Sequence, residues 1–303
     1  MNDFDKHPDF EECDRLLRQL IDEVTYWKSD LAGGRQVALG DTALERLFKT
    51  EITFGNPRDK LIRLTEDNFQ SGGGKLSEIY RQQMADTHDF YSMTLTVNLR
   101  PKPGVQFRRL CCELDWSPKG EKEAIVQGMF PKNEWRTLME WGAGMDLGLN
   151  ENLDWTVGVD SSSLGEIARL PGELKGKVSS KNDLKAFVVV PNYQYQIGRS
   201  EITALGEGSS TCYWYIKDAD MQKRRSLELS VLFKVPRGVG AVQLRGVVWA
   251  EPNMNWLTAD LKEVVRELSD RLRFLLKSKD EAERKLARGL SETWDLTLPN
   301  AVN

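Results

Sequence analysis

The side chains best suited to catalysis are scarce in this chain, and they follow no known motif. The chain has two histidines and four cysteines, and no cysteine belongs to a Cys-x-x-Cys pair. This leaves little material for a zinc site or an imidazole-based active site. A cysteine nucleophile needs an imidazole partner, and the candidate pairing is Cys212 with His88. A buried strand thiol is the more common state of such a cysteine.

Glycine-rich segments supply no nucleotide-binding or acyl-transfer motif. Residues 71–75 read Ser-Gly-Gly-Gly-Lys, but the phosphate-loop spacing is absent, and Leu76 stands where a magnesium-binding hydroxyl belongs. Residues 206–210 lack the Gly-x-Ser-x-Gly order of a nucleophile elbow. Carboxylates number 46, so their spacing alone singles out no acid–base pair. We therefore predict no catalytic residue, no metal site and no cofactor.

One basic stretch is a candidate anion contact, and it consists of Lys223, Arg224 and Arg225. It precedes a predicted strand, and Tyr213 and Trp214 are aromatic residues that would stack on bases if the anion were a nucleic acid. Asp218 and Asp220 interrupt the positive charge. A solvated turn explains the stretch equally well, and we do not expect nucleic-acid binding.

Composition places the chain among ordinary globular proteins. Of its 303 residues 40% are hydrophobic and 29% charged, with a formal net charge of −4. This mild acidity argues against a protein whose main task is to neutralise nucleic-acid phosphates or an anionic membrane. The acidic N-terminus does not resemble a signal peptide, and no apolar stretch reaches the roughly 18 residues of a membrane-spanning helix. We expect a cytoplasmic protein with reduced cysteines and no membrane span.

The elements that position these residues begin with a helix. From residue 10 to residue 31 apolar residues recur in steps of three and four, the a/d spacing of a helical seam. Asp9 with Glu12 forms a capping-box start, and Gly33 provides a left-handed stop. Shorter helical patterns follow at residues 42–50 and 76–85. The first 88 residues are therefore predicted to be mostly helical.

Strand patterns with a period of two follow, and they occur in two similar units. In each unit a strand, at residues 91–99 or 227–235, leads through a Pro- and Gly-containing turn into a second strand. The sequence Val-Gln-Leu-Arg at 242–245 matches Val-Gln-Phe-Arg at 105–108, 137 positions earlier. In the strand after the first turn the alternation directs Cys112 inward and Cys111 outward. We predict an internal duplication of a β-hairpin–helix unit.

The C-terminal region carries a long 4-3 apolar pattern that predicts an amphipathic helix. A seam this regular suits a helix that meets another helix, either within this chain or in a second chain. If the seam meets a second chain, the candidate partner-binding residues are Leu261, Val265, Leu268, Leu272, Leu275, Lys279 and Leu286.

Together these patterns predict the α+β fold class: an antiparallel β body with the duplicated unit, a helical N-terminal segment and a long C-terminal amphipathic helix. The predicted divisions are a helical segment (1–88), a first antiparallel β unit with a short helix (89–160), a linker or surface loop (161–183), a second antiparallel β unit (184–255), and the long helix with a tail (256–303).

Our leading functional hypothesis is a non-enzymatic protein-interaction or assembly component. It would bind a protein partner, or a second copy of itself, through a terminal heptad helix or an exposed aromatic sheet face. The first alternative is a binder of small apolar molecules, in which a sheet wraps around the C-terminal helix as in helix-grip folds. The second alternative is an enzyme with a carboxylate site.

Overall fold

The computed structural model describes residues 7–31, 42–65, 69–71, 78–131, 143–146, 186–190, 201–218, 221–223, 225–260 and 279–300. The described elements in chain order are α1 (Phe10–Leu31), α2 (Ala43–Phe48), β1 (Glu51–Phe54), the 3-10 helix η2 (Pro57–Lys60), β2 (Leu61–Leu64), β3 (Phe69–Ser71), α3 (Glu78–Gln82), the π-helix η4 (Gln83–Thr87), β4 (His88–Arg100), β5 (Phe107–Ser117), β6 (Ile125–Phe130), β7 (Ala143–Asp146), β8 (Ala186–Val190), β9 (Glu201–Leu205), β10 (Thr211–Lys217), the 3-10 helix η7 (Met221–Lys223), β11 (Ser226–Pro236), β12 (Ala241–Pro252), α5 (Met254–Asp260), α7 (Lys279–Lys285) and β13 (Arg288–Thr297).

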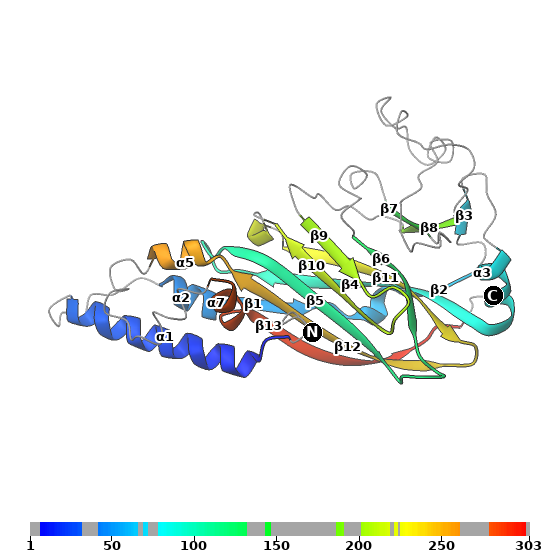
Figure 1. Cartoon of the computed structure of the whole chain (residues 1–303), viewed down its shortest axis with the longest axis horizontal. Helices are drawn as coiled ribbons and strands as arrows, with labels where there is room; N and C mark the ends of the chain where they lie inside the picture. Colours follow the sequence, from blue (N-terminus) through cyan, green and yellow to red (C-terminus); the bar gives the residue numbers. More distant parts are fainter. Residues whose placement is uncertain are drawn as a thin grey trace, which may run out of the picture.

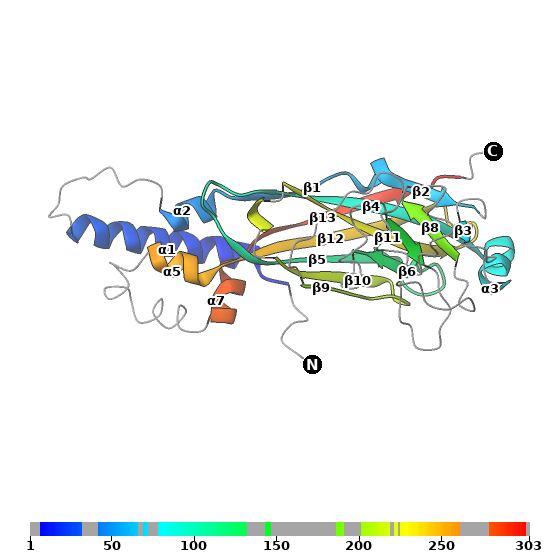
Figure 2. The same cartoon turned by 90° about the horizontal axis from the view of Figure 1, so that it is seen from above.

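Two five-stranded antiparallel sheets form the body of the protein (Figures 1 and 2). The first sheet has the strand order β1-β4-β11-β6, with β2 also paired to β4, and the second has the order β13-β12-β5-β10-β9. A small third sheet has the order β3-β8-β7. Helices α1, α2, α5 and α7 gather at one end of the body, and α3 lies at the other end. None of the described helices is long and apolar enough to cross a membrane.

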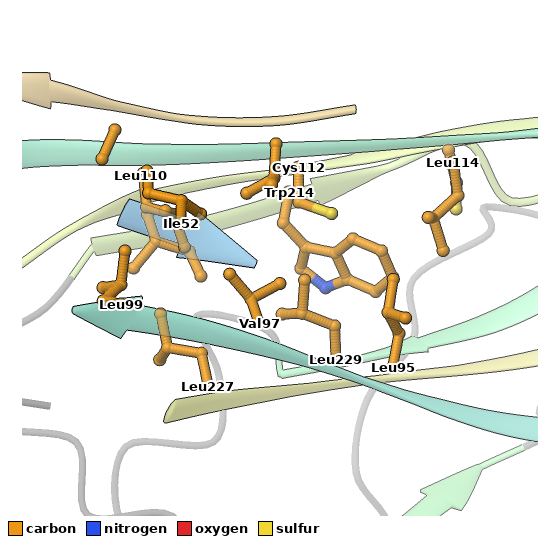
Figure 3. Close-up of a cluster of buried hydrophobic side chains, with 14 of the residues drawn as sticks. Ile52, Leu95, Val97, Leu99, Leu110, Cys112, Leu114, Trp214, Leu227 and Leu229 are labelled. Carbon is orange, nitrogen blue, oxygen red and sulfur yellow. The ribbon is translucent and has the colours of Figure 1, made fainter. Parts of the chain in front are cut away.

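The hydrophobic core lies between the two large sheets and is filled by side chains (Figure 3). Leu95 and Leu229 point inward from the first sheet, and Trp214 points inward from the second. The rings of Trp116 and Phe233 bridge the sheets with centroids 5.6 Å apart. This alternation arises because successive side chains of a strand point to opposite faces. The helix-grip arrangement, with a sheet around the C-terminal helix, is therefore not formed by the described residues.

The two similar strand–turn–strand units are not hairpins, and this part of the predicted fold is wrong. Each turn carries the chain from one sheet to the other, so β4 pairs with β11 and β5 pairs with β12. Thr94 faces Ser230, and their buried hydroxyl oxygens are 2.8 Å apart. Cys112 faces Val248 in the second sheet. The residues of both pairs are 136 positions apart, close to the offset of the predicted duplication, which itself stays a prediction.

The N-terminal helix is confirmed, but the N-terminal segment is less helical than predicted. The backbone amides of Glu11 and Glu12 donate to the Asp9 carboxylate at 3.0 and 3.2 Å, and α1 packs against α2, α7 and β13. Three strands, β1, β2 and β3, lie between α2 and α3. Strands of three or four residues are too short to show a period, and β1 and β2 form by pairing with β4.

The predicted long C-terminal helix is wrong, because the last described element is a strand. α5 and α7 are helices of seven residues each, and β13 then pairs with β12 over ten residues. Trp294 and Leu296 lie two positions apart on the strand, which is strand periodicity. Gly289 lies in β13, where an added Cβ would be 2.3 Å from the Val248 carbonyl oxygen. Glycine is therefore required by close packing at this position.

Candidate functional site

The predicted partner-binding helix falls mostly outside the described residues. This applies to Leu261, Val265, Leu268, Leu272 and Leu275. Lys279 begins α7, and Leu286 follows the end of that helix. The side chain of Leu286 is fully buried in the core of this chain. Leu286 is therefore not exposed to a second chain in this structure.

The structure separates the predicted anion contact from the basic residues Lys234 and Arg237. Lys223 ends η7, Arg225 is exposed, and Arg224 lies outside the described residues. Lys234 and Arg237 lie toward the opposite end of β11 from Arg225. At about 3.3 Å per residue, the distance along the strand from Arg225 is roughly 30 Å or more. Trp214 is fully buried in the core, so it offers no surface for stacking on a base.

The cysteines are placed as structural residues. All four are buried and free of disulfides. Cys112 and Cys212 belong to the main core, whereas Cys111 joins a separate cluster on the opposite face of the second sheet, which confirms the predicted inward and outward directions. Burial raises the pKa of Cys212 well above its usual value, which disfavours a thiolate. Among the described residues no group of His, Cys, Asp and Glu side chains is arranged to hold a metal ion.

The outer face of the second sheet carries a buried ion pair. Arg109 on β5 and Glu251 on β12 are cross-strand partners, their atoms Nη1 and Oε2 are 2.8 Å apart, and their side chains are 9% and 4% exposed. Trp249 donates its indole N–H to Glu251 at 3.3 Å, and the guanidinium of Arg109 lies 5.0 Å from the ring centroid of Tyr215. Burial raises the pKa of Glu251, and the charge of Arg109 opposes that rise.

A second ion pair attaches α7 near this cluster. Arg108 donates to the buried Glu283 of α7 at 2.7 Å. Sequence spacing alone does not single out Glu251 or Glu283 among the 46 carboxylates. In the structure each of the two forms an ion pair with an arginine. The Arg108–Glu283 pair joins α7 to β5, whereas the Arg109–Glu251 pair joins β5 to β12. Their geometry does not indicate catalysis.

An exposed apolar pair lies on the same outer face, at the edge of the sheet. Leu205 on β9 and Tyr213 on β10 are direct cross-strand partners, and they are 49% and 44% exposed. We call these two residues the β9 patch. Among the described strands none pairs with the far side of β9. β6 of the first sheet lies close to β9, and its Val126 exchanges backbone hydrogen bonds with Gly208 and Ser209 just beyond the end of β9.

Charged residues border the β9 patch. Lys217 pairs with Glu201 at 3.1 Å beyond one end, and Lys119 pairs with Asp115 at 2.5 Å beyond the other. Glu113 is the cross-strand partner of Tyr213, and in the described part of the chain no cation lies within ion-pair distance of it. An apolar centre with a polar rim is the usual anatomy of a protein interface.

Sequence reasoning names an exposed aromatic sheet face but does not identify Leu205. The available signal is the alternation of β9 and β10, which places residues 201, 203 and 205 on the same face as 213 and 215. Which face is solvated depends on the partner sheet, which local patterns do not reveal.

Comparisons with known proteins do not assign the chain to a family. No protein-family model matches the chain, and no curated protein matches its sequence. Similar solved structures include the membrane-inserted form of the Clostridium perfringens NetB toxin, with 9% identity and a TM-score of 0.23 over 55% of this chain and 77% of that one. A pore-forming protein has 5% identity and a TM-score of 0.28 over 66% and 79%. The collagen-binding domain of a Staphylococcus aureus adhesin has 7% identity and a TM-score of 0.19 over 55% and 78%. Similarities this low carry no argument about fold or function.

Proposed function

We propose that the protein is a non-catalytic interaction component that binds an extended segment of a partner protein along β9. The observation that carries the proposal is the exposed Leu205–Tyr213 pair at a sheet edge to which no described strand is paired on the far side. In strand addition the main-chain hydrogen bonds of the edge give affinity, and alternate side chains give specificity.

The opposite edge of the same sheet is covered, which makes β9 distinctive. Arg58 donates to the backbone carbonyl of Asp295 on β13 from Nε at 3.1 Å and from Nη2 at 2.7 Å. Phe54 packs edge-on against Trp294 with ring centroids 5.1 Å apart. Natural sheets protect edges in this manner because an open edge invites pairing with another chain. On β9 the described cover is confined to β6, which hydrogen-bonds to Gly208 and Ser209 beyond the end of the strand.

The charged residues around the β9 patch indicate which side chains the partner segment would carry. A large apolar side chain would pack over the β9 patch, and a lysine or arginine would pair with the carboxylate of Glu113, for which the described residues provide no ion-pair partner. A second copy of this chain would bring another Glu113 to the same surface. A heterologous segment that combines apolar and basic residues therefore fits better.

Native mass spectrometry of the protein purified gently from its own host tests the proposal. We expect an added protein mass with the wild-type chain and its loss with Leu205→Lys. Ile62→Lys is the matched control, because Ile62 is also 49% exposed on the short strand β2. Loss of the added mass with both variants, or its retention with Leu205→Lys, would contradict binding at β9. A chain that carries only a small-molecule mass would contradict the interaction function itself.

A further inference from the structure

A half-open pocket lies at the α3 end of the first sheet (Figure 1). Its cavity volume is about 260 Å³, and its walls come from β2, α3, η4 and the start of β4. The wall segment η4 is a π-helix, a rare conformation that is frequent at functional sites. The pocket shares no residue with the β9 patch, so a ligand bound here is independent of the partner-binding function.

The charged groups that line this pocket are engaged within the chain. Nη2 of Arg63 is 2.5 Å from the buried carboxylate of Asp89. Arg81 also has an interaction within the chain. An anion would have to break these contacts and leave buried charge without its partner, so an uncharged ligand fits the pocket better.

His88 supplies a hydrogen-bonding group to the pocket. Its Nδ1 lies 2.7 Å from Oγ1 of Thr87, and that hydroxyl donates to the carbonyl oxygen of Gln83 at 3.4 Å. A hydroxyl has a single proton, so while it donates to Gln83 it accepts from Nδ1. The hydrogen-bond network thus assigns the proton of the neutral ring to Nδ1 and a lone pair to Nε2. Among the described residues no donor lies within hydrogen-bond distance of Nε2.

The surroundings of His88 favour the neutral ring. Burial, followed by the ammonium of Lys234, lowers the pKa of His88, and the charge of Asp89 opposes the shift. Lys234 is held beside η4 because it donates to the side chain of Gln83 at 3.1 Å. Since the ordinary pKa of histidine is about 6.5, the ring is neutral near pH 7. Nε2 is therefore an acceptor that suits a donor group of a ligand.

The remaining wall is apolar. Leu64 and Phe90 are buried, and Met84 and Ala85 complete this side. At roughly 30 Å³ per water, the cavity holds about nine waters, so a ligand that fills it has on the order of ten non-hydrogen atoms. Mostly apolar walls with a few convergent polar groups are typical of small-molecule sites.

We propose that this pocket binds a small, uncharged phenol whose O–H donates to Nε2 of His88 and whose ring packs against Met84 and Phe90. A phenolic O–H is a stronger hydrogen-bond donor than an aliphatic one. An aromatic ring also makes favourable contacts with the thioether of Met84 and the ring of Phe90.

The test is a titration of the full chain with para-ethylphenol, followed by NMR of the histidine rings. This phenol is about the size of the cavity and is uncharged near pH 7, because phenols ionise only near a pKa of about 10. Its isomer para-methylanisole has the same atoms but no O–H, which makes it the matched control. We expect para-ethylphenol to shift the His88 ring signals saturably. The signals of His7, the only other histidine, should not move, because His7 lies outside the pocket.

The hydrogen bond also predicts a difference in affinity and a direction of titration. Para-ethylphenol should bind about three- to tenfold more tightly than para-methylanisole, the usual contribution of one uncharged hydrogen bond. Occupancy should lower the pKa of His88 further, because a hydrogen bond to the neutral ring disfavours its protonated form, whereas a bound anion would raise that pKa. The charged groups on the surrounding elements act in both the free and the bound state; they are Arg63, Arg81, Asp86, Asp89, Lys234 and Arg237.

Two variants separate the hydrogen bond from the cavity. His88→Phe keeps a ring but removes Nε2, so it should weaken para-ethylphenol about three- to tenfold and leave para-methylanisole unchanged, as followed by the methyl signal of Met84. His7→Phe is the matched control and should change neither affinity. If His88→Phe does not fold, Ala85→Trp at an exposed wall position replaces it and should abolish binding of both probes by filling the cavity.

Four results would overturn the proposal or part of it. Equal binding of the two isomers, or equal binding of para-ethylphenol by His88→Phe, would overturn the hydrogen bond to His88. Tighter binding of benzoate than of para-ethylphenol would overturn the uncharged ligand. No shift of the His88 signals, or unchanged binding by Ala85→Trp, would overturn the site as a whole.

Discussion

The buried Arg109–Glu251 pair makes a prediction about stability that single and double substitutions can test. At a separation of about 4 Å and an effective dielectric constant near 20, unit charges attract by about 4 kcal/mol. Arg109→Met removes this attraction and leaves a carboxylate that is 4% exposed without its partner. We expect it to lower the free energy of unfolding by about 3–5 kcal/mol near neutral pH, the usual cost of breaking a buried pair.

Glu251→Gln alone should also be clearly destabilising, because Arg109 stays protonated and its guanidinium, 9% exposed, loses its carboxylate partner. Burial raises the pKa of Glu251 even with Arg109 present, so the folded protein already disfavours the ionised carboxylate. For the same reason, adding Glu251→Gln to Arg109→Met should restore most of the lost stability. A carboxyl group with a raised pKa in the folded state destabilises the fold above that pKa, and the penalty is relieved as pH falls through it. The deficit of Arg109→Met should therefore shrink on acidification.

Urea unfolding followed by tryptophan fluorescence measures these differences, since the chain has nine tryptophans. Lys217→Met is the matched control on the same sheet face. Its partner Glu201 is 63% exposed, so we expect a loss of no more than about 1 kcal/mol. A loss below about 1 kcal/mol for Arg109→Met, or no recovery in the double variant, would refute the reasoning.

Three further predictions concern the body of the fold. Gly206→Ala should lower the thermal unfolding temperature far more than Gly208→Ala. A Cβ at Gly206 would lie 2.3 Å from the Thr211 carbonyl oxygen, whereas a Cβ at Gly208 meets nothing within 4 Å. Leu95→Ala should cost about 2–5 kcal/mol and Ile62→Ala about 0.5 kcal/mol or less in urea unfolding, since the first side chain is fully buried and the second is half exposed. All four cysteines should resist Ellman's reagent in the folded protein and react after denaturation, and rapid labelling of a native thiol would contradict their burial.

Local periodicity predicted the strands well because a sandwich buries one face of each strand. The alternation at 91–99 and 227–235 lies within β4 and β11. The direction of Cys111 and Cys112 followed from the same rule.

Arrangements that depend on distant residues were not predictable from local patterns. A strand followed by a short turn and a second strand looks the same whether the turn closes a hairpin or crosses between sheets. The strand β13 follows a helical pattern directly, and only its pairing with β12 distinguishes it from a loose tail. Arg109 and Glu251 are far apart in sequence, and Arg63 and Arg81 reach one pocket from different elements. Such convergence arises from the tertiary fold.

Site-specific photo-crosslinking in the native host tests the central claim most directly. A photoreactive amino acid would replace Leu205 in one variant and Ile62 in another, two positions with equal exposure. Strand addition at β9 predicts a discrete crosslinked partner from position 205 and none from position 62. No adduct at position 205, or the same adduct from both positions, would contradict it.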